Sequence, residues 1–227
     1  MDIVLVAGLW LQQSIWDETS ALLRERDYRG VPVSLPGQDD DNTGAILSDQ
    51  IDAVINEIDN APGAPVVVGH SAACSLAWLA ADARPYKVGK VVLVGGFPHA
   101  EGESYADFFD YEEGLMPFPG WDQFDDRDTA DLDHAARRAM EESMTAVPKG
   151  VTQAVMRYTD VRRYSIPVAV VCPEFSVTEA QEIIDSGDVY EIANTTRVTL
   201  HDIDSGHWPM ISKPGAFTEA LIEAAEA

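Results

Sequence analysis

The chain has few cysteines, few basic residues and no long apolar run, and each shortage excludes a class of protein. It has two cysteines in 227 residues, Cys74 and Cys172, both in apolar surroundings, so a disulfide framework is not expected. Fifteen basic against 39 acidic residues give a formal net charge of −24. That charge makes nucleic acids and anionic membranes poor partners, so neither is expected.

Targeting and cofactor signatures are missing as well. The opening MDIVLVAGLWLQQ has no basic region, and its apolar run ends after about ten residues, too few for a signal peptide or a membrane span. We therefore expect a cytoplasmic protein. No GxGxxG follows the first apolar run and there is no P-loop lysine, so no nucleotide cofactor is expected.

A group of aspartates suggests calcium at first sight, but it lacks the spacing and the glycine of an EF-hand, so no metal is expected. We interpret the group as a solvated acidic surface; its members are Asp122, Asp125, Asp126, Asp128, Asp131 and Asp133.

The chain does contain short β-branched runs that alternate with helical patterns. Most of the runs are almost continuously hydrophobic, as in strands buried on both faces of a parallel sheet. The expected strands are residues 2–7, 30–36, 64–69, 90–96, 166–172 and 197–203. The expected helices are residues 14–26, 44–59, 71–83, 178–185 (opened by a capping box of Thr178 and Gln181) and 214–227. This alternation predicts an α/β fold, with a mostly parallel central sheet and helices on both faces.

One segment interrupts the alternation. Residues 97–164 are acidic and rich in aromatic residues and proline, and then become helical. A stretch of this length is too long for a connection between two core strands. We predict one domain whose core comprises residues 1–96 and 165–227, with residues 97–164 inserted as a cap over the C-terminal edge of the sheet, where open α/β sheets bind ligands.

The stretch PVVVGHSAAC places a hydroxyl between small residues where a buried strand passes into a helix. A sharp turn of this kind holds a serine in a strained conformation, and bulky neighbours would collide there. Ser71 lies between Gly69 and Ala73, two residues away on each side. The pattern indicates a nucleophile, although a serine that merely caps the helix has the same local sequence.

A serine hydroxyl needs a base to attack at neutral pH. Of the five histidines, His207 is the candidate, because DIDSGHWPM places it in a loop after the last strand, at the same sheet edge as Ser71. We interpret His99 as bracing a loop, His134 as solvated and His201 as lying within a strand. His70, beside the serine, is interpreted as a packing or substrate-contacting residue.

The acid that orients the base should come from a loop between the serine and the histidine. Glu174, at the end of the run IPVAVVCPE, is the candidate. The alternatives left open are Glu101, Glu103, Glu179, Asp202 and Asp204.

Two backbone N–H groups should stabilise a developing oxyanion. We expect them from Ala72, directly after the serine, and from Leu9 in the loop after the first strand, with Trp10 as an alternative donor. Trp10 is also a candidate wall of the substrate pocket, and simple core packing is the competing interpretation.

Taken together, IVLVAGLW, LPGQDD, VVVGHSAA, IPVAVVCPEF and DIDSGHWP resemble the α/β-hydrolase superfamily over essentially the whole chain, in the order serine, acid, histidine. The short length and compact cap are similar to the small esterases related to plant methyl-ester hydrolases and hydroxynitrile lyases. The chain has Ala7-Gly8 where that family usually has His-Gly.

The resemblance implies hydrolysis of a small, neutral, hydrophobic ester, thioester, amide or lactone through an acyl-enzyme, with no metal or organic cofactor. The expected partner is a small-molecule substrate, and the sequence indicates no oligomeric state. Two alternatives remain open: cleavage of a C–C bond, as in a hydroxynitrile lyase, and ligand binding without catalysis.

Overall fold

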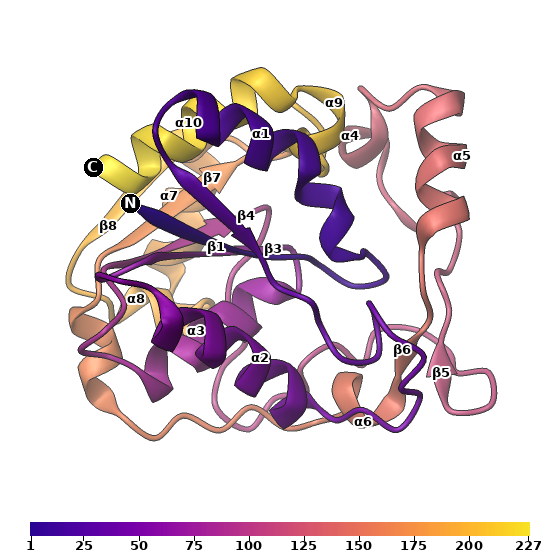
Figure 1. Cartoon of the computed structure of the whole chain (residues 1–227), viewed down its shortest axis with the longest axis horizontal. Coiled ribbons are helices and arrows are strands. Elements are labelled where there is room, and N and C mark those ends of the chain that lie inside the picture. Colours follow the sequence, from indigo (N-terminus) through magenta and orange to yellow (C-terminus); the bar gives the residue numbers. More distant parts are fainter.

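A six-stranded parallel sheet forms the centre of the computed structural model, which describes all of residues 1–227 (Figure 1). The strand order is β2-β1-β3-β4-β7-β8. The strands are β1 (Asp2–Val6), β2 (Arg29–Pro32), β3 (Val66–His70), β4 (Lys90–Val94), β7 (Val168–Cys172) and β8 (Val198–Asp202). Their carboxyl ends all meet at one edge, and the predicted α/β class is confirmed.

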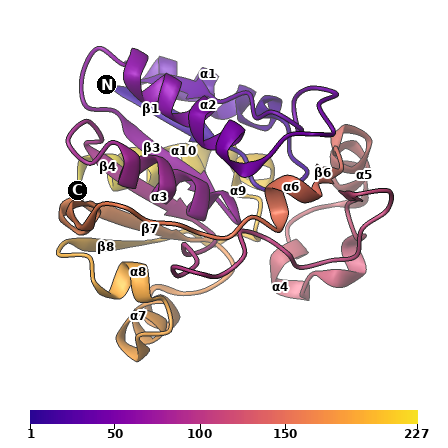
Figure 2. The ribbon, with the colours of Figure 1, turned by 90° about the horizontal axis from the view of Figure 1, so that it is seen from below.

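Helices cover both faces of the sheet. Because successive side chains of a strand point to opposite sides, one strand contributes to two separate cores. In β1, Val4 and Val6 belong to the core beneath α2 (Leu47–Asn60) and α3 (Ala73–Ala83). Ile3 and Leu5 belong to the opposite core, with α1 (Asp17–Glu25) and α10 (Pro214–Glu226). Figures 1 and 2 show these two helical layers on either side of the sheet. None of the helices is long and apolar enough to cross a membrane.

The second strand is shorter than the predicted 30–36, because the side chain of Asp39 binds the backbone after Val33. The Asp39 carboxylate accepts hydrogen bonds from the N–H groups of Leu35 and Gln13, at 2.8 and 2.7 Å. These bonds tie the segment after β2 to the loop after β1 instead of extending the sheet.

The prediction for the helix after β7 was wrong about its start. α7 (Val177–Ser186) opens on a capping box of Ser176 and Glu179, not of Thr178 and Gln181. The Ser176 hydroxyl accepts the N–H of Glu179, and the Glu179 carboxylate accepts the N–H of Ser176. The Glu179 carboxylate is a stronger hydrogen-bond acceptor than the Gln181 amide. The helix therefore begins at the capping box that lies earlier in the chain.

Residues 97–164, the predicted insert, contain only short elements between β4 and β7. These are β5 (Leu115–Met116), η2 (Trp121–Gln123), α4 (Asp126–Thr129), α5 (His134–Ser143), β6 (Val147–Pro148), α6 (Lys149–Thr152) and the start of η3 (Val161–Ser165). Strands β5 and β6 pair with each other, apart from the main sheet. Figure 1 shows α4, α5, β5 and β6 together at one end of the molecule. The remaining elements are η1 (Gln13–Trp16), α8 (Tyr190–Ala193) and α9 (Pro209–Ser212).

Candidate active site

Ser71 lies in the turn between β3 and α3, with a φ of 56°. Left-handed backbone is unfavourable for a residue with a side chain, so the surroundings must enforce it. The Ser71 N–H donates to the carbonyl of Val94 at 2.8 Å. A Cβ on Gly69 would lie 2.3 Å from the carbonyl oxygen of Ala73, so only glycine fits two residues before the serine. The turn is as tight as the small residues of the sequence indicate.

His207 lies in the loop between β8 and α9, and its ring is held by Glu174 from the end of β7. Its Nδ1 donates to Glu174 Oε1 at 2.7 Å, since a carboxylate only accepts. In the neutral ring Nε2 is then left without a proton, ready to accept one. Burial acts to raise the pKa of Glu174, but the hydrogen bond and the proximity of His207 outweigh it, so this pKa lies below its ordinary value.

Gly95, which the sequence did not single out, gives the imidazole its space. It has a φ of 62°, and a Cβ there would lie 3.1 Å from His207 Nδ1 and 3.4 Å from Glu174 Oε2. The end of β4 therefore passes directly beside the pair. The double glycine after a strand, Gly95-Gly96, was the available signal.

His70 lies beneath the same loop and is 1% exposed. Its Nε2 donates to the backbone carbonyl of His207 at 2.8 Å, because a carbonyl only accepts. Burial, and then the proximity of His207, lowers the pKa of His70 to about 3, so the ring is neutral at ordinary pH. Its main contact is thus with the His207 loop, while contact with a substrate stays a prediction.

Ser71 and His207 line one hollow with Leu9, Trp10, Phe124 and Trp208. Its volume is about 20 Å³, enough for about one water molecule. No hydrogen bond joins the Ser71 hydroxyl to the His207 ring in this structure. The hollow brings together a strained serine, a histidine with a free ring nitrogen and apolar walls.

The loop after β1 forms one side of the hollow and is held from below by Gln38. The buried amide of Gln38 donates to the carbonyls of Gly8 and Leu11, both at 2.9 Å. These two bonds fix the loop, and Leu9 lines the hollow, while its role as an oxyanion donor stays a prediction. Gln38 lies in the LPGQDD motif, but the sequence did not give it this role.

A family model described as the alpha/beta hydrolase family matches residues 3–220. The chain belongs to the α/β-hydrolase family. No curated protein matches it.

Solved structures share the fold of this α/β hydrolase over nearly its whole length. An extracellular α/β-hydrolase from a Paenibacillus species is 18% identical with a TM-score of 0.78, covering 99% of this chain and 98% of that one. A methylesterase, MES16 from Arabidopsis, is 14% identical with a TM-score of 0.75, covering 100% and 99%. Polyneuridine aldehyde esterase is 15% identical with a TM-score of 0.74, covering 99% and 98%. At these identities the likeness is one of fold.

The alternative acids of this α/β hydrolase have partners away from His207. Glu101 binds Arg157 and the N–H of Tyr158, and Glu103 binds the N–H of Ala100. Glu179 belongs to the α7 capping box, and Asp202 and Asp204 are exposed. Among the carboxylates considered, Glu174 alone contacts the imidazole.

Two of the six aspartates interpreted as solvated surface are only partly exposed, so that interpretation does not describe them fully. Asp128 and Asp131 are half-buried against the His207 loop. The carbonyl oxygen of Asp128 accepts the N–H of His207 at 2.8 Å, and Asp131 Oδ2 accepts the N–H of Gly206 at 2.9 Å. Burial raises the pKa of the Asp128 carboxyl above its ordinary value. These contacts span more than 70 residues of sequence, and no local pattern indicates them.

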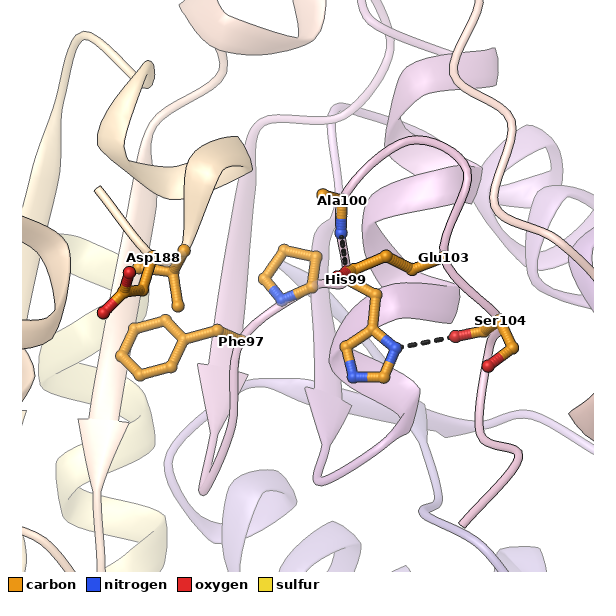
Figure 3. A pocket seen from close by; sticks show the side chains of 8 residues that line it. Phe97, His99, Ala100, Glu103, Ser104 and Asp188 are labelled. Carbon is orange, nitrogen blue, oxygen red and sulfur yellow. Dashed lines mark hydrogen bonds between the residues drawn. The ribbon is translucent and has the colours of Figure 1, made fainter. Parts of the chain in front are cut away.

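A second hollow of this α/β hydrolase, about 640 Å³ and so larger than the one at Ser71, lies elsewhere. It lies between the segment after β4 and the junction of α7 with α8, and Phe97, His99 and Asp188 line it (Figure 3). His99 Nδ1 donates to the carbonyl of Ser104 at 2.7 Å, which agrees with its interpretation as a loop brace. The hydrogen bonds drawn in Figure 3 join His99 to Ser104 and Ala100 to Glu103 within one loop, and none of the residues that line the hollow has a positive φ.

Proposed function

We propose that this protein is a serine hydrolase that cleaves a small, neutral, hydrophobic carboxylic ester through an acyl-enzyme. One observation carries the proposal: the Glu174–His207 pair, joined at 2.7 Å, ends in the hollow where Ser71 sits at a φ of 56°. A left-handed serine costs free energy, about 1–3 kcal/mol, and such strain is concentrated at functional sites.

In the first step, His207 Nε2 takes the proton of the Ser71 hydroxyl as its oxygen attacks the acyl carbon. The Nδ1–H of His207 stays bonded to Glu174, which fixes the ring and stabilises its positive charge. The charge that develops on the acyl oxygen is met by the N–H groups of Ala72 and Leu9. Ala72 lies at the start of α3, so the helix dipole adds to this stabilisation.

In the second step, the imidazolium gives its proton to the departing alcohol. A water molecule then enters, loses a proton to His207 and attacks the acyl carbon. His207 returns that proton to the Ser71 oxygen as the acyl–oxygen bond breaks, which releases the acid and restores the hydroxyl. The proposed reaction thus uses side chains and backbone N–H groups of this chain together with water.

The walls of the hollow support an apolar substrate group. The Trp10 ring packs against Phe109, Phe118 and Phe124, at centroid distances of 5.8, 5.5 and 6.4 Å. Three of these four residues belong to residues 97–164, which we propose act as a cap over the site. The net charge of −24 disfavours a strongly anionic substrate. The esterases among the solved structures of this fold are consistent with an ester.

Release of p-nitrophenol from a series of short-chain esters tests the proposal. We expect a burst of alcohol in the wild type, and a loss of turnover of about 10⁴- to 10⁶-fold in Ser71→Ala. Glu174→Gln should lose about 10³- to 10⁴-fold, because the ring then loses its orienting charge. Glu101→Gln is the matched control and should retain wild-type turnover, since Glu101 binds Arg157 instead.

Turnover that persists in a clean Ser71→Ala preparation would overturn the assignment of the nucleophile. Wild-type protein that cleaves a cyanohydrin but hydrolyses no ester would instead support the lyase alternative. Wild-type protein that binds esters without turning them over would support ligand binding alone.

A further inference from the structure

The loop that carries His207 lies directly against residues of the insert. His207 N–H donates to the carbonyl of Asp128 at 2.8 Å, and Gly206 N–H donates to Asp131 Oδ2 at 2.9 Å. A Cβ on Gly206 would lie 2.3 Å from the Asp128 carbonyl oxygen and 2.5 Å from Asp131 Oδ1. Only glycine permits so close an approach, so the loop and the insert meet backbone to backbone.

These contacts complete the fixation of His207. Its carbonyl accepts from His70 at 2.8 Å, its Nδ1 donates to Glu174 at 2.7 Å, and its N–H is held by Asp128. Nε2, the atom that the proposed reaction uses, is therefore the polar atom of His207 left free. Rotation or retreat of the loop would have to break at least one of these bonds.

The Asp131 carboxylate is not placed to favour stability alone. Oδ2 accepts the Gly206 N–H, while Oδ1 is buried without a hydrogen-bond partner. A buried carboxylate oxygen without a partner costs free energy, and such a group calls for a functional explanation. Its hydrogen bond to Gly206, the residue directly before the proposed base, supplies one.

We propose that Asp131 is a positioning residue for His207: by holding the N–H of Gly206, its carboxylate sets the base in line with Ser71 when the insert is docked. The inference rests on the proposed function, because the alignment matters only if His207 acts as a base. By this proposal the Asp131 carboxylate of the insert helps to align His207 with Ser71, although Asp131 itself contacts no substrate.

The insert also holds the opposite side of the hollow. Thr145 N–H donates to the carbonyl of Trp10 at 2.9 Å, and the Trp10 indole N–H donates to the carbonyl of Met116 at 3.1 Å. Trp10 has a φ of 65° and follows Leu9, the expected oxyanion donor. One segment thus fixes the loop of the base and the loop of the oxyanion donor together.

The small volume of the hollow means that the contacts of the insert with the two loops affect substrate entry. About 20 Å³ admits a water molecule but no ester, so walls of the hollow must move aside for substrate to enter, and Phe124 and Met144 of the insert are among those walls. Redocking restores the Asp131–Gly206 bond, and alignment then follows closure. Loss of that bond should therefore lower kcat more than it changes KM.

The test compares Asp131→Ala and Asp131→Asn with Asp126→Ala as the matched control. Asp126 is an exposed aspartate in the same segment, and no hydrogen bond or ion pair joins its side chain to either loop. We expect Asp131→Ala to lose about 10- to 100-fold in kcat with KM nearly unchanged, because a small displacement of the base has effects of this size. The rate of fluorophosphonate labelling of Ser71 should fall in parallel. Asp131→Asn keeps an acceptor oxygen and should recover most of kcat, and Asp126→Ala should match the wild type.

Wild-type kcat in Asp131→Ala, a change confined to KM, or an Asp131→Asn as slow as Asp131→Ala would each overturn the inference. If Asp131→Ala does not fold by circular dichroism, Gly206→Ala replaces it, since its Cβ pushes the same loop away from the insert, and the same loss in kcat is expected. Ser71→Ala, measured in parallel, distinguishes a failure of the proposed function from a failure of this inference. Turnover that persists there contradicts the proposed function, whereas turnover that depends on Ser71 but not on Asp131 contradicts this inference alone.

Discussion

Two of the four non-glycine residues with positive φ, Ser71 and Trp10, line the small hollow. Each is held by a backbone hydrogen bond from a distant segment: Val94 accepts the N–H of Ser71, and Thr145 donates to the carbonyl of Trp10. Strain in this backbone region persists only where the surroundings impose it. Its concentration on both sides of one hollow supports a catalytic role more strongly than either residue does alone.

His70 should make the protein sensitive to acid. Its pKa falls from 6.5 to about 3 on folding, so below pH 6.5 the unfolded chain binds a proton that the folded chain does not. Its contribution to the free energy of unfolding is complete above pH 6.5 and is lost as the pH falls towards 3. We expect this loss to approach about 1.4 kcal/mol per pH unit, measured by urea unfolding at several pH values.

His70→Asn is the comparison for that measurement, because it removes the titrating ring but keeps a side-chain N–H donor. Its unfolding free energy should fall less steeply with acid than that of the wild type. Glu174, whose pKa is lowered, loses its contribution in the same direction, so the difference between the two slopes is the decisive quantity. Parallel slopes would contradict a neutral His70 in the folded protein.

Among single residues, the sequence predicted those that are marked by their immediate neighbours in the chain. Ser71 and Glu174 follow buried strands and His207 a strand end, and each lies where the chain pattern places it. The structure adds Gln38, Gly95 and Asp131, whose partners are far away in sequence. A hydrogen bond between residues more than 25 positions apart leaves no periodicity to detect.

Among the helices and strands, a buried charge cluster fixes the chain where it returns from the insert. Arg163 donates to Glu191 at 2.7 Å and to Asp82 at 3.3 Å, so it joins η3 to α8 and α3. Trp78 Nε1 donates to the same Glu191 at 3.0 Å. Arg163 is 6% exposed, Asp82 3% and Glu191 0%, so the three charges depend on one another.

Arg163→Ala should therefore destabilise the protein by about 3–5 kcal/mol, because it leaves two buried carboxylates without their cation. Arg162→Ala is the matched control: its guanidinium is exposed and pairs with Asp160, so its loss should change the free energy of unfolding far less. Urea unfolding measures both. Equal midpoints for the two variants would show that the buried cluster does not stabilise the fold.

The elements themselves were more predictable than their ends. Hydrophobic runs identified all six strands of the sheet. β1, β3, β4 and β7 are almost wholly buried, whereas the edge strands β2 and β8 are only partly buried. The ends of β2 and α7 were missed because side chains set them: Asp39 in one case, Ser176 with Glu179 in the other. Boundaries depend on a few polar contacts, whereas the elements depend on the whole apolar pattern.

Across the whole molecule, the insert and the core meet at the proposed site. The sequence indicated a cap from the length and composition of residues 97–164, but not that it would hold both loops of the proposed site. Those contacts arise only once the sheet has brought the ends of β1 and β8 to the same edge. The alignment that we propose for Ser71 and His207 would thus be a property of the assembled molecule.

The net charge of −24 should make the thermal stability of the protein depend on salt. With 39 acidic and 15 basic residues, most carboxylates repel one another in the compact state more than in the unfolded chain. Raising the salt concentration from about 0.01 M to about 0.15 M shortens the screening length from about 30 Å to about 8 Å. This change should weaken the long-range repulsion, while the buried Arg163 cluster is hardly screened. We expect Tm, measured by circular dichroism at pH 7, to rise with added NaCl, and Arg163→Ala to show the same rise from a lower starting value. A Tm that falls with salt would mean that surface ion pairs outweigh the repulsion of the excess acidic residues.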